Sequence, residues 1–157
     1  MRNNYVKISL NNLKHNIDVI NSGLLPGTKY CAIVKANAYG HGMEAVSRAA
    51  LEHGASCLAV AFAEEGVRLR DAGFTSPILL LGATDEAHMA TVLDYRLTPA
   101  IFTLDALRAL QKQAAAVKKT CPFHFKIDTG MNRIGFKTTE EFCQALDVLQ
   151  QECPNLV

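Results

Sequence analysis

Apolar and polar positions along this chain follow two alternating patterns, one typical of amphipathic helices and the other of buried strands. From Leu10 to Leu24, apolar side chains recur at spacings of three and four, which places them on one face of a helix. Further along, short and continuously apolar runs are separated by helix-like segments. We therefore expect strands at residues 5–10, 30–34, 57–61, 77–81, 97–102 and 123–128.

Local signals predict where several of the helices begin. Thr84, Thr103 and Thr138 are each expected to cap the helix that follows, because a threonine hydroxyl accepts a hydrogen bond from a free N–H group of the first turn. Thr138 also forms a capping box with Glu141. Further helices are expected at 10–24, 43–53 and 63–71, and the segment 36–42 is expected to be a glycine-containing loop.

Alternation of apolar strands with helices is typical of a parallel sheet that helices cover. Five complete βα units begin near residues 30, 57, 78, 98 and 123. Two α/β architectures fit: an open doubly wound sheet, or the opening part of a (β/α)8 TIM-type barrel, which typically has about 250 residues. Residues 155–157 look like the start of a further strand, which favours the barrel. In both architectures, reactive groups lie just beyond the carboxyl ends of the strands.

Composition narrows the class of protein. The chain has 157 residues, of which 49% are hydrophobic, and its 16 basic residues nearly balance 15 acidic ones. We therefore expect one globular domain without the basic excess of a nucleic-acid-binding protein. No apolar run approaches the roughly 18 residues of a membrane helix, and the N-terminus does not resemble a signal peptide, so we expect a cytoplasmic protein. Five cysteines without a CxxC pair and five scattered histidines predict neither a disulfide framework nor a metal site.

The first candidate site is the segment 34–42, which follows an apolar strand. Lys35 ends that strand, where partial desolvation lowers the pKa of an amine and leaves it neutral enough to attack an aldehyde. Gly40 and Gly42 let the backbone approach a ligand closely before the next helix, and Tyr39 is able to donate its hydroxyl to a phosphate. The alternative is that Lys35 extends from a strand end into solvent and the glycines only form a turn. Composition alone favours this alternative.

The second candidate site is the segment 125–136, which also leaves the end of a strand. Lys126, Asp128 and Arg133 bring charge to this end of the sheet, and the guanidinium of Arg133 is suited to an anionic oxygen. The alternative is a surface ion pair between Asp128 and Arg133, which stabilises little. Taken alone, this segment leaves both interpretations open.

Together, the two segments resemble the bacterial alanine racemase family of pyridoxal-phosphate enzymes. Residues 34–42, Val-Lys-Ala-Asn-Ala-Tyr-Gly-His-Gly, are similar to the signature around the cofactor lysine of that family. Residues 126–135, Lys-Ile-Asp-Thr-Gly-Met-Asn-Arg-Ile-Gly, are similar to its second landmark. The segments 58–61 with Glu64 and Glu65, and 77–82, also resemble the family, so that the resemblance covers essentially the whole chain.

The resemblance implies roles for five residues. Lys35 matches the lysine that holds pyridoxal phosphate and acts as a base on one face of the substrate Cα. Tyr39 matches a tyrosine that binds the cofactor phosphate. Arg133 matches the arginine that contacts the phenolic oxygen of the cofactor at the substrate site. Lys126 matches a lysine that is carbamylated in many members and then positions that arginine. The backbone N–H of Met131 matches a group that meets the substrate carboxylate.

The resemblance also implies an activity. Members racemise L-alanine and D-alanine and so supply D-alanine for peptidoglycan; they work as homodimers whose second base, a tyrosine, comes from the partner subunit. Members are about twice as long as this chain, so residues 1–157 match the N-terminal part of the cofactor-binding barrel. We therefore expect the chain alone to be inactive and to self-associate through exposed sheet edges. The alternatives are a serine or broad-specificity racemase, a cofactor-binding or structural module without turnover, and a complete five-unit α/β domain of unrelated function.

Overall fold

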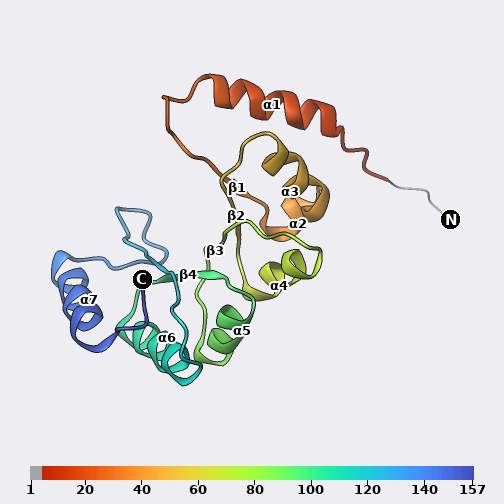
Figure 1. Ribbon diagram of the computed structural model, residues 1–157. Coiled ribbons are helices and arrows are strands. Elements are labelled where there is room, and N and C mark those ends of the chain that lie inside the picture. The colour runs from red at the N-terminus through yellow and green to blue at the C-terminus, as the bar shows by residue number, and fades with distance from the viewer. Residues whose placement is uncertain (1–4) are drawn as a thin grey trace.

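Five parallel strands form one sheet, and they lie side by side in the order in which they occur along the chain (Figure 1). The computed structural model describes residues 5–157. Neighbouring strands pair in register, with Leu58 opposite Ile78 and Ala100 opposite His124, for example. The strands are β1 (Cys31–Ile33), β2 (Cys57–Val60), β3 (Ile78–Leu80), β4 (Thr98–Ile101) and β5 (His124–Phe125).

Helices connect the strands and follow the outer side of the curved sheet, as α3 to α6 do in Figure 1. A doubly wound sheet reverses its strand order at a switch point, whereas this order runs from β1 to β5 without reversal. The structure therefore confirms the α/β class and the partial TIM-type barrel. The helical elements are α1 (Leu10–Ser22), α2 (Lys35–Tyr39), α3 (Met43–Glu52), α4 (Ala63–Asp71), η1 (Glu86–His88), α5 (Met89–Asp94), α6 (Leu104–Ala116) and α7 (Thr139–Glu152).

The hydrophobic core lies between the sheet and these helices. Both strand residues and helix residues contribute to it, and its largest members are fully buried. Complete burial of an aliphatic side chain stabilises a fold by roughly 1.5–3 kcal/mol, which makes this layer the main support of the carboxyl ends of the strands. The fully buried set includes Leu58, Val60, Ile78, Leu80 and Ile101 from strands, and Met43, Leu69, Met89, Leu107 and Leu110 from helices.

The N-terminal segment differs from its prediction. Residues 5–9 form no strand; Ser9 instead caps α1, and its hydroxyl accepts a hydrogen bond from the backbone N–H of Asn12 at 3.3 Å. The segment that was expected to be a strand therefore leads directly into the helix. The apolar stripe of α1 is only partly covered: Ile17 is buried against the region of α3, whereas Val19 and Ile20 are exposed.

Two further predictions are corrected, and the remaining caps are confirmed. Thr84 caps no helix; Asp85 accepts a hydrogen bond from the N–H of His88 at 3.2 Å and begins a 3-10 turn, because a carboxylate one residue later fits the tighter turn. The strand expected at 123–128 is regular only over β5, although its pairing extends to Lys126, whose N–H donates to the carbonyl of Ile101 at 2.9 Å. Thr103 and Thr138 cap α6 and α7 as predicted.

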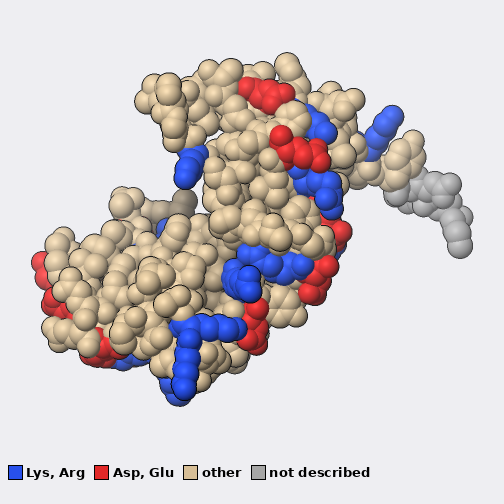
Figure 2. Space-filling model, viewed as in Figure 1, with Lys and Arg blue, Asp and Glu red and all other residues tan. Residues whose placement is uncertain are grey.

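The last residues begin a further parallel pairing. Leu156 forms a parallel bridge with Cys121, and the N–H of Cys121 donates to the carbonyl of Asn155 at 2.9 Å. On the face shown in Figure 2, basic and acidic side chains lie intermixed, without one continuous patch of either sign. Across residues 5–157, every helix is too short or too polar to span a lipid bilayer.

Candidate functional site

Lys35 stands at the carboxyl end of β1, where the chain leaves the sheet. The N–H of Val34 donates to the carbonyl of Ala59 at 2.8 Å, so the pairing of β1 with β2 ends one residue before the lysine. Val34 is fully buried, whereas Lys35 is half-buried. The lysine thus follows directly on the last rigid residue of the strand, at the end of the sheet where reactive groups are expected.

The residues after Lys35 form a left-handed helical turn, where the sequence predicted an irregular loop. Ala36, Asn37 and Ala38 have φ values of 51°, 55° and 53° with ψ values of 47°, 43° and 49°, and Tyr39 has a φ of 53°. Each such residue costs roughly 1–2 kcal/mol when it carries a Cβ atom, so the four together store about 4–8 kcal/mol of strain. Strain of this size is maintained only where surrounding contacts enforce it, and it is concentrated at functional sites.

Backbone hydrogen bonds and one side chain within the first βα unit support the turn. The N–H of Ala38 donates to the carbonyl of Val34 at 2.8 Å, and the N–H of Gly42 donates to that of Asn37 at 2.9 Å. The side-chain oxygen of Asn37 accepts from the N–H of Met43 at 3.0 Å and so joins the turn to the start of α3. This arrangement leaves the Tyr39 side chain 62% exposed, with its hydroxyl free to meet a ligand.

The second βα unit also contacts this turn. Glu65, in the first turn of α4, accepts a hydrogen bond from the N–H of Ala36 at 2.6 Å through Oε1. Its other oxygen, Oε2, accepts from the N–H of Ala61 at 2.7 Å. The sequence drew attention to Glu65 only as part of the family resemblance. Within the sequence, the one local feature that could have pointed to Glu65 is its position in the first turn of a helix. Its contact to Ala36 spans 29 residues and leaves no local pattern.

The segment after β5 forms a loop that closes on itself. The N–H of Phe136 donates to the carbonyl of Lys126 at 2.9 Å, and the N–H of Asp128 donates to the carbonyl of Phe136 at 2.9 Å. Gly135 makes this closure possible: its φ is 132°, and a Cβ atom there would lie 2.5 Å from the nitrogen of Asp128. The loop therefore holds Lys126 at its base and presents residues 129–134 at its tip.

Asp128 organises this loop from inside. Its Oδ1 accepts hydrogen bonds from the N–H groups of Gly130 and Asn132, each at 3.0 Å. These N–H groups, that of Asn132 foremost, lower the pKa of the Asp128 carboxyl below its usual value. Among the described residues Asp128 forms no ion pair with Arg133, so the alternative of a simple surface pair is wrong. Met131 and Arg133 remain exposed at the tip of the loop.

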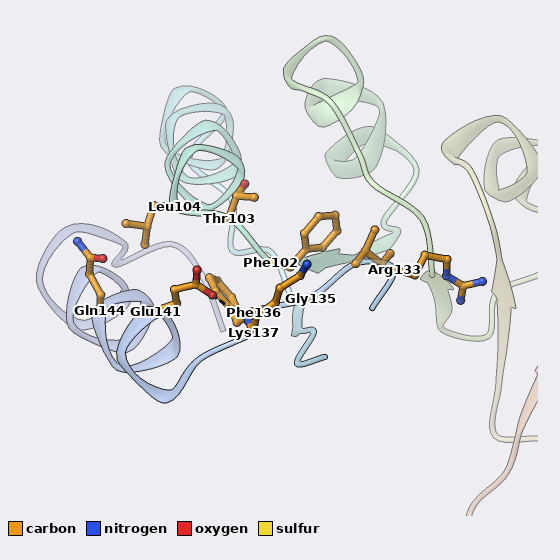
Figure 3. A pocket seen from close by; sticks show the side chains of 10 residues that line it. Phe102, Thr103, Leu104, Arg133, Gly135, Phe136, Lys137, Glu141 and Gln144 are labelled. Carbon is orange, nitrogen blue, oxygen red and sulfur yellow. Dashed lines mark hydrogen bonds between the residues drawn. The ribbon is translucent and has the colours of Figure 1, made fainter. Parts of the chain in front are cut away.

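Arg133 borders a cavity of about 410 Å³ between this loop and the starts of α6 and α7. Phe102 and Phe136 form apolar walls, and Glu141 and Gln144 of α7 line the far side. Figure 3 shows the guanidinium of Arg133 directed away from Glu141 and Gln144, toward the other strands of the sheet. The arginine is therefore free to bind an anionic group on that side.

The predicted site residues fall into two groups at the same end of the sheet. Lys35 and Tyr39 share the turn after β1, whereas Lys126, Met131 and Arg133 share the segment after β5. Since all strands are parallel, both groups lie at the carboxyl ends, on the two outer strands of the curved sheet (Figure 1). Together they offer an amine, a phenol hydroxyl and a guanidinium.

Comparison with known proteins identifies close relatives. A family model described as "Alanine racemase, N-terminal domain" matches residues 8–157. The alanine racemase of Ligilactobacillus salivarius (strain UCC118) is 40% identical over 155 residues, covering 99% of this chain and 42% of that protein. An alanine racemase structure from Clostridium difficile 630 has a TM-score of 0.89 and 32% identity, covering 96% of this chain and 41% of the other. The histidine racemase of Leuconostoc mesenteroides subsp. sake NBRC 102480 has a TM-score of 0.87 and 30% identity, covering 96% and 40%. The chain spans about two fifths of the length of these relatives.

Proposed function

The chain belongs to the alanine racemase family, and from this premise we propose that it forms the part of a pyridoxal-phosphate-dependent racemase that carries the cofactor lysine. In this proposal residues 1–157 are the N-terminal part of the cofactor-binding barrel, and the reaction interconverts L-alanine and D-alanine. The observation that carries the proposal is the strained turn after β1, which places Lys35 and Tyr39 together at the carboxyl end of the sheet.

The chemistry of the donor groups fits the cofactor. An amine reacts with an aldehyde, a phenol hydroxyl binds a phosphate, and a guanidinium binds an anionic oxygen; Lys35, Tyr39 and Arg133 supply these three groups. When bound, pyridoxal phosphate supplies an electron sink for the carbanion at the substrate Cα. We assign to Lys35 both the covalent attachment and the transfer of a proton on one face of that carbon.

The remaining site residues are proposed to bind and orient the cofactor and the substrate. Arg133 would hold the phenolic oxygen of the cofactor beside the substrate, and the backbone N–H of Met131 would bind the substrate carboxylate. Lys126, half-buried at the base of the same loop, would position Arg133 when it is carbamylated. A fixed guanidinium at the phenolic oxygen would favour electron density on that oxygen and limit how far charge spreads into the ring.

Racemisation needs a proton donor or acceptor on each face of the Cα, and Lys35 supplies one of them. We propose that the second base, a tyrosine, comes from a partner subunit of a homodimer. The chain of 157 residues is then inactive alone and self-associates through its outer strands, where Ile33 of β1 is 41% exposed. The racemase would work in the cytoplasm and supply D-alanine for peptidoglycan.

A wider substrate range is the second candidate. The likeness to a histidine racemase, at a TM-score of 0.87 and 30% identity, favours it. A serine or broad-specificity racemase would use the same Lys35 and Tyr39. These residues are proposed to bind the cofactor, which is the same for every substrate. Racemisation of alanine, serine and histidine by the same preparation, compared by kcat/KM, separates the two candidates.

The test of the cofactor site is a visible absorption spectrum of the chain with pyridoxal phosphate, followed by borohydride reduction and mass mapping. We expect a reducible absorption band and a stable adduct on Lys35, and we expect Lys35→Ala to lose both. Labelling scattered over the exposed lysines, equal in the wild type and in Lys35→Ala, would overturn the proposal. Loss of the substrate Cα–H, followed by exchange with deuterium oxide, then distinguishes a racemase from a module without turnover.

A further inference from the structure

Glu65 joins the first two βα units at the carboxyl end of the sheet. Its Oε1 accepts a hydrogen bond from the N–H of Ala36 at 2.6 Å, and its Oε2 accepts from the N–H of Ala61 at 2.7 Å. The N–H of Phe62 lies 3.4 Å from the same Oε2. One carboxylate thus binds the residue directly after Lys35 and the start of the loop that follows β2.

The N–H of Ala36 has no partner in the sheet, because the pairing of β1 with β2 ends at Val34. Ala36 is also the first left-handed residue of the turn, so its N–H points away from the direction that a continuing strand would give it. A backbone N–H without a partner favours a conformation in which it is satisfied elsewhere. Glu65 therefore stabilises the turn at the residue where the strand becomes left-handed.

The arrangement uses both oxygens of Glu65 as acceptors. Each accepts a hydrogen bond from a backbone N–H donor, which matches the two acceptor oxygens of this side chain. A glutamine would direct its NH₂ group at one of the two N–H donors and lose that bond. The first turn of α4 also favours a negative charge at this position.

We propose that Glu65 is a positioning residue for Lys35: by holding the N–H of Ala36, it fixes the direction in which the lysine leaves β1. The inference rests on the proposed function, because it takes Lys35 as the cofactor lysine. Glu65 acts only through the backbone of the turn. Its removal is expected to loosen the residues after Lys35 while the rest of the barrel stays folded.

Glu64 provides a matched control on the same turn of α4. Its side chain is 71% exposed and pairs with His88 at 3.3 Å, and it makes no hydrogen bond to the turn after Lys35. Glu64→Ala and Glu65→Ala change the charge of the chain equally. Only the second removes the acceptor of the Ala36 N–H, because alanine has no side-chain oxygen, whereas a glutamine could keep its one oxygen on Ala36.

The first readout is amide hydrogen exchange, which needs no cofactor. In Glu65→Ala, we expect exchange of the Ala36 amide to become about tenfold faster or more, because its acceptor is lost. The amides of the buried Leu80 and Leu107 should keep their wild-type rates, which shows that the variant is folded. Glu64→Ala should match the wild type. Unchanged exchange at Ala36 in a folded Glu65→Ala variant would overturn the proposal.

The second readout is the share of the borohydride-fixed pyridoxal-phosphate label that falls on Lys35. We expect Glu65→Ala to reduce this share several-fold and Glu65→Asp, which keeps the carboxylate, to restore part of it. Faster exchange at Ala36 with an unchanged share on Lys35 would make Glu65 a structural residue only and refute the positioning role. A wild-type chain with no label on Lys35 would refute the proposed function instead, and amide exchange then decides alone whether Glu65 holds the turn.

Discussion

Two glycines in the loop after β5 allow a sharp test of how this loop is built. Gly130 and Gly135 have nearly the same backbone angle, with φ values of 130° and 132°. Their surroundings differ: a Cβ atom at Gly130 would have no heavy atom within 4 Å, whereas one at Gly135 would lie 2.5 Å from the nitrogen of Asp128 and 2.8 Å from the carbonyl carbon of Ile127. Alanine at either position therefore meets the same backbone strain, but only at Gly135 does it also meet a steric conflict.

The expected free-energy losses follow from these two contributions. Gly130→Ala places a side chain in an unfavourable backbone region, which costs about 1–3 kcal/mol. Gly135→Ala adds about 1–3 kcal/mol for overpacking. It also displaces Asp128, and loss of that residue's hydrogen bond to Phe136 adds about 1 kcal/mol. We therefore expect Gly135→Ala to be less stable than Gly130→Ala by about 2–4 kcal/mol.

Urea unfolding of the two variants and the wild type measures this difference, provided that the three m-values agree. Equal losses of unfolding free energy in the two variants would refute the reasoning, because they would show that no close backbone approach exists at Gly135. A Gly130→Ala variant that is the less stable of the two would refute it as well.

Three further predictions concern other parts of the chain. Arg70 donates hydrogen bonds to four backbone carbonyls of two neighbouring loops at 2.7–2.9 Å, so Arg70→Gln should lower the unfolding free energy by about 2–4 kcal/mol in urea titrations. Burial raises the pKa of Cys31 to about 12, so iodoacetamide at pH 8 should label the exposed Cys143 first, as mass mapping will show. The hydrogen bond to Asp85 raises the pKa of His88 above its usual 6.5, so His88→Gln should lower stability below pH 6.5 and have a diminishing effect as pH rises through the raised pKa. Identical melting-temperature differences at pH 6 and pH 9 would contradict this last prediction.

The five βα units could be predicted because each depends on signals within a few residues. The helix α4 matches its predicted range of 63–71, and Thr103 and Thr138 cap the helices that follow them. The errors also have local causes. Residues 5–9 were expected to form a strand but lead directly into a helix capped by Ser9. Thr84 and Asp85 are adjacent capping candidates, and the carboxylate of Asp85 is the one that accepts the hydrogen bond.

The geometry of the candidate site was harder to predict. The segment after Lys35 contains alanine and tyrosine, which ordinarily avoid the left-handed region, so its sequence indicated only a loop. Its conformation depends on acceptors that other elements provide, above all Glu65, which lies 29 residues from Ala36. The role of Asp128 was equally hidden, since its proximity to Arg133 in sequence suggested an ion pair rather than the loop hydrogen bonds that the structure contains.

The two halves of the candidate site, the turn after Lys35 and the loop that carries Arg133, are stabilised by different contacts. This difference determines which substitutions affect each half. The loop that carries Arg133 is supported from within, by Asp128, Gly135 and the backbone of Phe136. The turn after Lys35 has hydrogen bonds of its own but also depends on Glu65 from the next βα unit. Because a strained backbone relaxes when its partners are removed, the turn is the more sensitive half. Changes at Glu65 in α4 should therefore alter the surroundings of Lys35, whereas Arg133 should respond most strongly to changes within its own loop.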